Sequence, residues 1–448
     1  MPLDRDEALR AIRAAGVVGA GGAGFPTYKK LESRVDHIIA NGAECEPLMY
    51  KDREVMLQRP EELLRGLAVQ RELTGAERVT LAVKRKNADV LEPLRPAAER
   101  EGVELFVMED VYPAGDEYVL VNDITGRRMR PGGIPLQVGV LVDNVETIVN
   151  VARAVEGRPV TSKFLTVAGA VREPLTAEVP VGTPIRDCLD LAGGCTLSDP
   201  VVLTGGVMMG GLETDLSLPV TKTTAGLVAL PADHPLVQRK GAPQREYDRI
   251  GHSCCDQCML CTELCPRYIL GYPIEPHRVM RSLLMTGEER DRISLWAEFC
   301  CECNVCTLFA CPEKLDPKNI CTDAKHRLKQ QGLRRSPEEL ERLFAPVHGM
   351  RKGRQIPIAM LYQRLGLRPY DHPAPFVPAT PRPAQVTLAL NSHVGVPATP
   401  TVQPGAAVRR GEPVATVAAD QLGCPVHASV DGTVSEVNPR GVVIRASA

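Results

Sequence analysis

The spacing of apolar residues predicts alternating helices and strands in the first part of the chain. Apolar side chains recur at helical intervals in residues 6–16, 61–73 and 88–102. Residues 78–86 and 103–110 are short runs rich in valine and leucine, as in strands. Strands that alternate with helices indicate an α/β domain, which we place at residues 1–160.

The middle of the chain has shorter elements. Residues 164–194 and 200–211 show strand-like runs separated by glycine turns, with one helical stretch. We place this second unit at residues 161–232. A third, helical unit is expected at 233–345. In it, residues 277–299 have the periodicity of a helical connector, and the capping signal at Ser336, Pro337 and Glu339 predicts the start of a short helix.

The last hundred residues divide into two parts. Prolines recur from residue 346 to residue 384, which is the composition of an extended linker. Beyond the linker, short strands with glycine and proline turns are predicted at 385–390, 406–417 and 428–446. They define a small C-terminal β unit at 385–448.

Length and charge limit the classes of function that the chain can have. The chain has 448 residues, too many for one core, and its net charge of −2 gives no reason to attract nucleic acid or an anionic membrane. The first residues are charged and do not form a secretory signal, and no apolar run approaches the ~18 residues of a membrane span. We therefore expect a cytoplasmic protein without direct membrane insertion.

The cysteines point to metal or redox chemistry. Ten of the fifteen lie between Cys254 and Cys311. In a reducing compartment such density argues against disulfides. The scattered cysteines are expected to be small buried side chains; they are Cys45, Cys188, Cys195, Cys321 and Cys424.

Two runs have the spacing of bacterial ferredoxins. The first, in residues 255–266, matches C-x2-C-x2-C-x3-C-P, and the second, in residues 300–312, has a last interval that is one residue longer. In such pairs the fourth cysteine of one run ligates the other cluster. One [4Fe-4S] cluster is therefore expected on Cys255, Cys258, Cys261 and Cys311, and the other on Cys265, Cys300, Cys303 and Cys306.

Zinc is the structural alternative, because tetrahedral zinc also accepts four thiolates. Zinc sites use two separated C-x2-C pairs, whereas this chain has triplets followed by C-P, which favours iron. Cys254 and Cys301 fall outside the x2 rhythm, and we interpret both as neighbours of the clusters or as incidental cysteines, with exchange for one of the ligands as the alternative.

A glycine-rich loop at residues 16–30 is the candidate entry point for electrons. Gly19, Gly21 and Gly24 satisfy G-x-G-x-x-G, but the segment before them is helical, so an ordinary dinucleotide-binding start is not expected. The glycines would allow close approach of a phosphate, with Lys29 or Lys30 as countercharge. The structural alternative is a flexible glycine turn.

Four segments resemble a known family. They are GAGGAGFPT at 19–27, NGAECEPLMYKDR at 41–53, YPAGDEYVL at 112–120 and DNVET at 143–147. Their order is similar to that in the NADH-binding flavin subunit of respiratory complex I and, in spacing, closer to the soluble RnfC-like proteins. The resemblance implies FMN and NADH contacts at Gly19, Gly21, Gly22, Gly24, Phe25, Lys30, Asn41, Glu44, Glu46, Asp116, Glu117 and Asn144.

Two positions depart from the complex I pattern. Complex I subunits usually have Asp where Ala43 stands and Glu where Asp116 stands. Glu44 and Glu46 fall where the family has acids near the flavin and nicotinamide, although an arbitrary E-x-E is more often a solvated loop.

The order of units resembles the PduS-type cobalamin reductases of bacterial microcompartments. The implied fold is multidomain α/β plus β: a Rossmann-like FMN/NADH domain, a ubiquitin-like SLBB β-grasp domain, a helical ferredoxin domain with two clusters, and a C-terminal barrel-sandwich hybrid. The barrel hairpin at His427 to Asp431 has no attachment lysine, so no swinging arm is implied. His393 and His427 are candidate cobalt or metal ligands, although a lone histidine is more often structural.

The resemblance implies an enzyme that passes electrons from NADH through FMN and two clusters to cobalamin, with an adenosyltransferase and a microcompartment shell protein as further partners. A D-x-H-x-x-G cobalamin signature is absent. One alternative is an RnfC-like subunit that delivers electrons to a ferredoxin or another protein. A second is a docking scaffold without redox activity.

Overall fold

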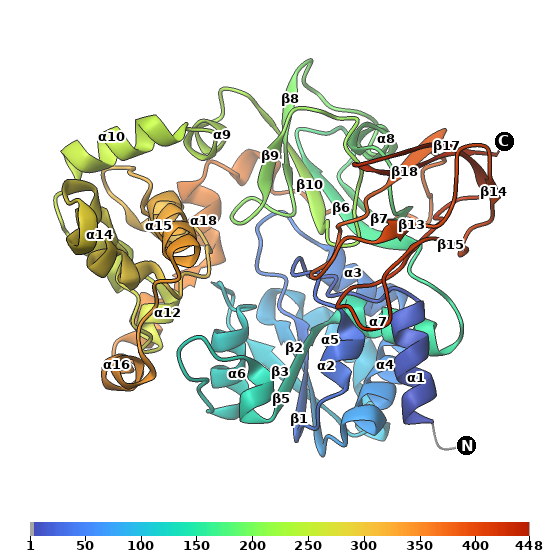
Figure 1. Ribbon diagram of the computed structural model, residues 1–448, viewed down its shortest axis with the longest axis horizontal. Helices are drawn as coiled ribbons and strands as arrows, with labels where there is room; N and C mark the ends of the chain where they lie inside the picture. Colours follow the sequence, from blue (N-terminus) through green and yellow to red (C-terminus); the bar gives the residue numbers. More distant parts are fainter. Residues whose placement is uncertain (1–3, 448) are drawn as a thin grey trace.

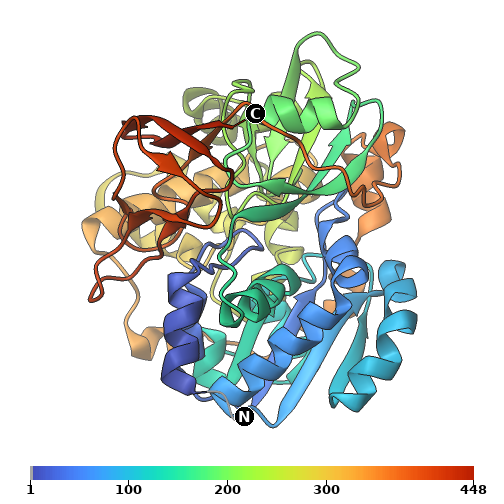
Figure 2. The ribbon, with the colours of Figure 1, turned by 90° about the vertical axis from the view of Figure 1, so that its right-hand side faces the viewer.

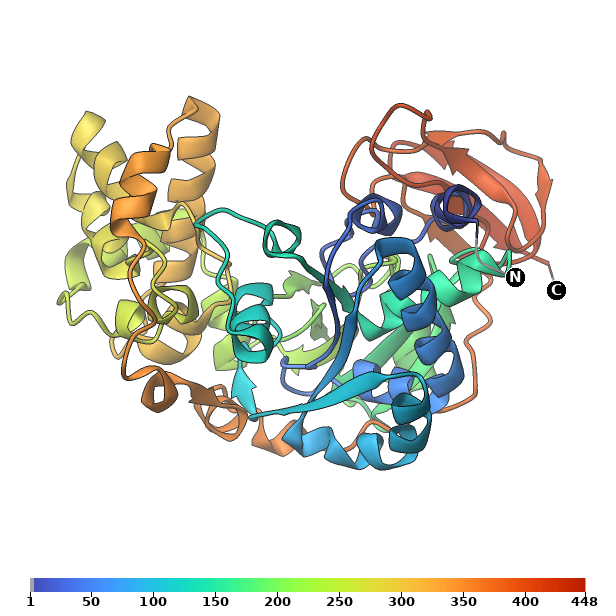
Figure 3. The same cartoon turned by 90° about the horizontal axis from the view of Figure 1, so that it is seen from below.

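The computed structural model describes residues 4–447, which form several packed units (Figure 1). The helical unit that carries the cysteine runs lies at one side of the molecule, and the C-terminal barrel lies at the other. The N-terminal α/β unit and the second sheet separate them in two perpendicular views (Figures 1 and 3). No helix within residues 4–447 is long and apolar enough to cross a membrane.

The N-terminal unit is built on a four-stranded sheet of order β3-β2-β1-β5, and all its strand pairs are parallel. Every strand and helix predicted for this region is found. The strands are β1 His37–Gly42, β2 Arg78–Lys84, β3 Val103–Met108 and β5 Val140–Asn144. The helices are α1 Arg5–Ala14, α2 Thr27–Leu31, α3 Lys51–Gln58, α4 Pro60–Thr74, α5 Leu91–Arg100, α6 Glu117–Thr125 and α7 Val145–Val155, with short 3-10 turns at Arg85–Val90 and Pro135–Val138.

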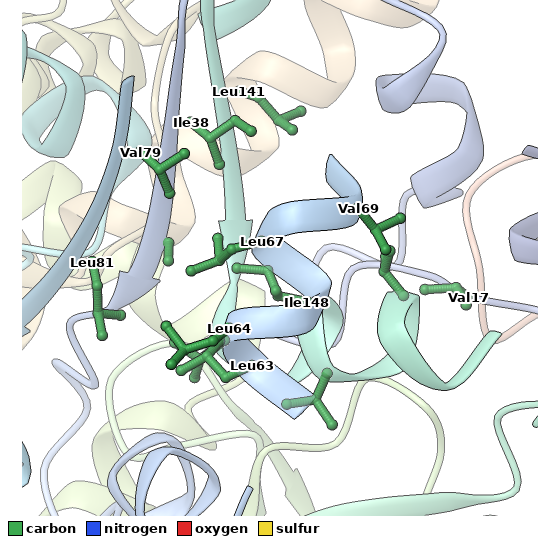
Figure 4. Close-up of a cluster of buried hydrophobic side chains, with 14 of the residues drawn as sticks. Val17, Ile38, Leu63, Leu64, Leu67, Val69, Val79, Leu81, Leu141 and Ile148 are labelled. Carbon is green, nitrogen blue, oxygen red and sulfur yellow. The ribbon is translucent and has the colours of Figure 1, made fainter. Parts of the chain in front are cut away.

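Leucines of α4 form the core on one face of this sheet (Figure 4). Leu63 and Leu67 are at most 1% exposed, and burial of each such side chain contributes roughly 1.5–3 kcal/mol. Gly66 lets α4 approach α7 closely, because a Cβ there would lie 2.1 Å from the backbone oxygen of Ile148. The apolar helical face predicted from sequence thus fixes the position of α7, whose first turn borders the candidate site.

The second unit is a five-stranded mixed sheet of order β7-β6-β10-β8-β9, in which only β10 and β6 pair in parallel. Its elements agree with the predicted short strands and single helix: β6 Ser162–Gly169, β7 Leu175–Pro180, α8 Ile185–Leu191, β8 Pro200–Thr204, β9 Gly211–Glu213 and β10 Gly226–Pro231.

The cysteine-rich unit is helical, as expected. Its helices are α9 Pro235–Lys240, α10 Gln244–Cys254, α11 Leu260–Glu263, α12 Pro266–Ile269, α13 Pro276–Arg281, α14 Gly287–Ser294, α15 Pro317–Gln331 and α16 Pro337–Leu343. The expected connector at 277–299 is helical but broken, because Gly287 has φ +57° and short 3-10 turns follow α13 and α14. Ser336 caps α16 as predicted, accepting a hydrogen bond from the backbone N–H of Glu339.

The prediction of an extended linker at 346–384 is wrong in its first half. Residues 351–370 form α17 Arg351–Arg354, β11 Ile356–Pro357, α18 Ile358–Arg364 and a 3-10 turn at Arg368–Tyr370. Strand β11 pairs antiparallel with β4 (Val111–Tyr112) of the N-terminal unit. Leu361 and Leu367 are fully buried, and the Tyr362 hydroxyl accepts a hydrogen bond from the Leu48 backbone N–H at 2.8 Å. The apolar residues between the prolines supply a buried face that proline spacing alone did not reveal.

The C-terminal unit is a small barrel of two sheets that lies beside α1 (Figure 2). Its strands are β12 Gln385–Leu388, β13 Thr399–Pro400, β14 Ala407–Val408, β15 Pro413–Thr416, β16 Val426–His427, β17 Gly432–Asn438 and β18 Gly441–Ala446. The buried Lys222 joins three units, because its Nζ donates to the backbone oxygens of Gly16 at 2.8 Å and Pro425 at 3.1 Å. The barrel therefore contacts both of the units that precede the cysteines.

His427 is buried at this junction and should make the barrel sensitive to acid. Burial, with the nearby Lys222 charge, lowers the pKa of His427 to about 3 from its ordinary 6.5. The unfolded chain therefore binds more protons than the folded chain between these values, so stability is lost as pH falls from about 6.5 through about 3. We expect His427→Asn to reduce this loss, which is on the order of a few kcal/mol. The measurement is hydrogen exchange of β17 and β18 at pH 7 and pH 4.5, corrected for intrinsic rates.

The matched control for this prediction is His372→Asn, because His372 is exposed. This control should keep the wild-type dependence on pH. If hydrogen exchange of β17 and β18 quickens equally between pH 7 and pH 4.5 in wild type and in His427→Asn, the role of His427 is contradicted.

Candidate functional site

The candidate site lies at the carboxyl ends of β1 and β5. These strands are adjacent and parallel, and their register pairs Asn41 with Asn144. Strand order reverses here, because the chain continues from β1 to β2 on one side and returns to β5 on the other. Ligands of open α/β sheets bind at such switch points. Two predicted site residues are thus placed side by side by the topology.

The glycine loop covers this edge. It follows helix α1, as expected from sequence, and closes on itself through hydrogen bonds from Gly19 N–H to the Phe25 oxygen and from Gly24 N–H to the Gly19 oxygen. A Cβ at Gly21 would lie 3.2 Å from Asn144 Cβ. Gly22 has φ +117° and no atom within 4 Å of a Cβ built there, so the backbone is open on that side. The loop therefore packs on Asn144 and leaves a glycine surface free for a ligand.

A second turn meets the same edge between β4 and α6. Asn41 Nδ2 donates to the backbone oxygen of Gly115 at 3.1 Å. Lys30 donates to Asp143 at 3.3 Å and lies 3.9 Å from Glu117. Burial opposes the charge of Lys30, but Asp143 and Glu117 hold its pKa above the usual value. A retained positive charge thus lies beside the open glycine loop.

A buried network of charges underlies the loop, and sequence reasoning missed it. Glu146, in the first turn of α7, forms ion pairs with Lys51 at 3.0 Å and with Lys163. Lys163 also donates to the Ala20 backbone oxygen at 2.9 Å, which ties the glycine loop to the second sheet. Burial lowers the pKa of Lys163 to about 8. The available signal was a lone lysine in an apolar strand and the Glu of the DNVET segment.

Other predicted residues have partners of their own. Glu46 accepts hydrogen bonds from the backbone N–H groups of Met208 and Met209 at 2.8 and 2.9 Å, so it holds a turn of the second sheet. Glu44 accepts from the Asp52 N–H at 2.7 Å, and burial together with Asp52 raises its pKa to about 7. Asp116 caps α6 and pairs with Arg267 at 2.7 Å.

The first predicted set of cysteines surrounds one cavity. Cys255, Cys258, Cys261 and Cys311 all line it, together with His277 and Met280. Burial, together with the neighbouring thiols of Cys255, Cys311 and Cys258, raises the pKa of Cys261 to about 12. Iron binding to these thiols would therefore release protons.

The second predicted set is also a group of neighbours. Burial raises the pKa of Cys306, as do the thiols of Cys300 and Cys265. The pKa of Cys303 is raised by a hydrogen bond with Cys301, by burial and by the nearby Cys265 and Cys306. Cys301 is thus a neighbour of this set, as expected.

Cys321, predicted as an isolated buried cysteine, is fully buried but lies against the second set. A hydrogen bond with Cys300 raises its pKa. The sequence separation between the two residues concealed this contact, which α15 creates by packing across the second run.

The two runs share a backbone conformation and both have donors near their sulfurs. Gln257 and Met259 in the first run, and Glu302 and Asn304 in the second, all have φ near +60°. The Gln257 side chain donates to the Cys255 sulfur at 3.1 Å, and the Leu315 N–H donates to the Cys311 sulfur at 3.3 Å. Hydrogen bonds to sulfur tune cluster potentials. Within residues 4–447 no group of three His, Cys, Asp or Glu side chains is placed to hold a single metal ion.

The packing of Gly21 on Asn144 leads to a prediction. We expect Gly21→Val to abolish FMN retention, with at least a hundredfold weaker binding, because the added carbons would displace the loop from Asn144. The measurement is the flavin released by heating the purified protein. The control is Gly349→Ala, since Gly349 is exposed and has no neighbour within 4 Å of its Cβ position. Flavin retained by Gly21→Val, or lost equally from the control, would contradict the assignment.

Four regions of the chain match described domain families. Residues 12–153 match the Nuo51 FMN-binding domain, residues 164–211 the SLBB domain, residues 254–316 the 4Fe-4S dicluster domain and residues 374–447 the RnfC barrel sandwich hybrid domain. These matches confirm the predicted order of domains, and they confirm FMN and two [4Fe-4S] clusters as the cofactor set.

Relatives cover nearly the full chain. The chain is 43% identical over 448 residues to the cobalamin reductase PduS of Salmonella typhimurium, and the match covers 99% of this chain and 97% of the relative. The chain belongs to the PduS family of cobalamin reductases. A second PduS, from Citrobacter freundii, is also 43% identical, over 97% of the chain and 95% of its own length.

Relatives outside the PduS family match in part. One component of the Na(+)-translocating ferredoxin:NAD(+) oxidoreductase complex of Acetobacterium woodii is 31% identical over 60% of this chain and 59% of its own length. Among solved structures, an NAD+-reducing [NiFe]-hydrogenase in the H2-reduced state has a TM-score of 0.50 and 22% identity, and covers 77% of this chain and 63% of its own. This likeness shows a shared fold.

Proposed function

We propose that this chain is an NADH-dependent cobalamin reductase. The observation that carries the proposal is the match to PduS over 99% of the chain, together with a glycine cradle and two groups of thiols in one molecule. When bound, FMN accepts the electron pair of NADH and the clusters carry single electrons. The protein's part is to hold these groups at fixed positions and to set their potentials.

The residues at the carboxyl edge have distinct roles in this proposal. The open backbone of Gly22 and the charge of Lys30 suit the flavin phosphate. Asn41 and Asn144 present amide groups from adjacent strands. Glu44, whose pKa is raised to about 7 by burial and by Asp52, suits the nicotinamide side, where the family has an acid.

We propose that each cluster is held by three thiols of one run and by the last thiol of the other run, as the spacing predicts. Cys311 from the second run completes the cavity of Cys255, Cys258 and Cys261. Cys265 from the first run is a neighbour of Cys303 and Cys306. Each set therefore joins three thiols of one run with the last thiol of the other.

The proposal is tested by anaerobic reduction of hydroxocobalamin with NADH or NADPH, followed by visible absorbance. We expect rapid reduction with NADH and none without the protein. Reduction of a ferredoxin at a much higher rate than cobalamin would instead favour the RnfC-like role. If the reconstituted protein oxidises no NADH with any acceptor, the remaining alternative is a docking scaffold without redox activity.

The setting of the reaction follows from the family alone. We propose that the chain acts in a bacterial microcompartment, with an adenosyltransferase as the consumer of reduced cobalamin and a shell protein as a docking partner. The support is the PduS name of the two full-length relatives. Co-purification with intact microcompartments tests the location.

A further inference from the structure

The eight proposed ligand thiols differ sharply in exposure. Cys258 is exposed, Cys255 and Cys300 are partly exposed, and the others are buried. Met259 and Leu260, which follow Cys258, are 38% and 42% exposed. One edge of the first set therefore reaches the surface beside two apolar side chains.

The second set is instead packed against the N-terminal unit. Cys303 shares a buried cluster with Leu48 and Tyr112, and the Tyr112 hydroxyl donates to the Cys303 backbone oxygen at 2.9 Å. Arg267, two residues after Cys265, pairs with Asp116 at 2.7 Å where both side chains are nearly buried. This set therefore lies next to the turn that borders the candidate flavin site.

The first set has no such contact with the N-terminal unit in its apolar core. Cys255 and Cys311 belong to a cluster whose described members all lie between residues 247 and 324. The two sets meet each other, because α11, which carries Cys261, contacts the turn at Cys306–Ala310. The thiols thus form a line from the N-terminal unit to the surface.

We propose that the Cys265–Cys300–Cys303–Cys306 set is the inner electron carrier and that electrons leave the protein from the Cys255–Cys258–Cys261–Cys311 set, across the surface of Met259 and Leu260. This inference rests on the proposed function and specifies where electrons leave the protein. One NADH yields two electrons and a proton, so two single-electron transfers across this surface reduce two Co(III) centres to Co(II).

The corrin of cobalamin is the occupant that this surface fits. Cys258, Met259 and the exposed Pro312 line one cavity, and the exposed Leu260 follows Met259 in the chain. The exposed Asp256 and Glu313 line the same cavity. A flat macrocycle can cover so small an apolar surface, and methionine adapts to irregular ligands. A protein partner would need roughly 800 Å² on each side. The barrel, with His393 and His427, lies on the far side of the molecule from the cysteine unit (Figures 1 and 3).

The test uses two leucines of the cysteine unit with equal exposure. Leu260 and Leu333 are both 42% exposed. In anaerobic holoprotein, we expect Leu260→Glu to slow cobalamin reduction at least tenfold, while electron paramagnetic resonance shows both clusters still reduced by NADH. Leu333→Glu should match wild type in both measurements. An unchanged cobalamin rate in Leu260→Glu, or an equal loss in Leu333→Glu, would overturn the exit surface.

A second measurement does not depend on cobalamin. Cys258→Ala should remove the signal of the outer cluster, and Cys303→Ala should remove the signal of the inner cluster. A soluble dysprosium chelate should speed the magnetic relaxation of the outer signal strongly and that of the inner signal far less. The reverse order would overturn the assignment of inner and outer sets. If wild type fails to reduce cobalamin, the proposed function fails, while this measurement still decides the order. If Leu260→Glu reduces a ferredoxin more slowly than wild type does but reduces cobalamin at the wild-type rate, the corrin is not the occupant of this surface.

Discussion

Replacement of Glu146 by glutamine should destabilise the N-terminal unit by about 3–5 kcal/mol, because it leaves Lys51 and Lys163 buried without their shared carboxylate. Both lysines are at most 3% exposed, so water cannot replace the lost partner. Asp52 remains 2.5 Å from Lys51 as a charged partner, whereas Lys163 loses the carboxylate with which it pairs and keeps neutral acceptors such as the Ala20 backbone oxygen. The glycine loop should therefore loosen together with the second sheet.

Thermal unfolding and flavin content measure this effect. We expect the unfolding midpoint of Glu146→Gln to fall by roughly 10 °C and bound FMN to be lost. The matched control is Glu156→Gln, at the other end of α7, whose exposed pairs with Arg65 and Arg158 contribute about 0–1 kcal/mol. Equal midpoints in the two variants would show that the buried network does not hold the site together.

Replacement of Cys258 by alanine should stop electron exit and spare flavin reduction. The thiol lies in the first set, whereas the glycine loop and the second set keep their contacts. We expect cobalamin reduction to fall at least a hundredfold, while NADH still bleaches the flavin at the wild-type rate. Stopped-flow absorbance follows both events in one experiment.

The neighbouring Cys254 provides the control for this variant, because it is exposed and does not line the cavity. Cys254→Ala should behave as wild type. Loss of flavin bleaching in folded Cys258→Ala would show that the linear order of carriers is wrong.

Sequence spacing was sufficient for the features that depend on local chemistry. The intervals between cysteines predicted both sets, and the comparisons confirm the two clusters, although the individual ligands stay a prediction. The helical periodicity of residues 61–73 predicted α4, since apolar residues on one face have to be buried. The glycine loop was correctly expected to follow a helix instead of a strand.

Contacts between distant segments could not be read from spacing. The pair of Asp116 with Arg267 and the network of Glu146 with Lys163 join residues from different units, and the positions of these charges along the chain do not reveal which of them pair. The same holds for residues 351–370, where proline content suggested a linker and the buried Leu361 decided otherwise. Tertiary burial determined the structure at each of these places.

The proposed function requires one chain to carry a flavin and two iron–sulfur clusters. Its most direct test is the iron, acid-labile sulfide, zinc and FMN content of protein purified without oxygen. We expect about eight irons, about eight sulfides and about one FMN per chain, with no zinc. Colourless protein with zinc in place of iron and no flavin released on heating would contradict it.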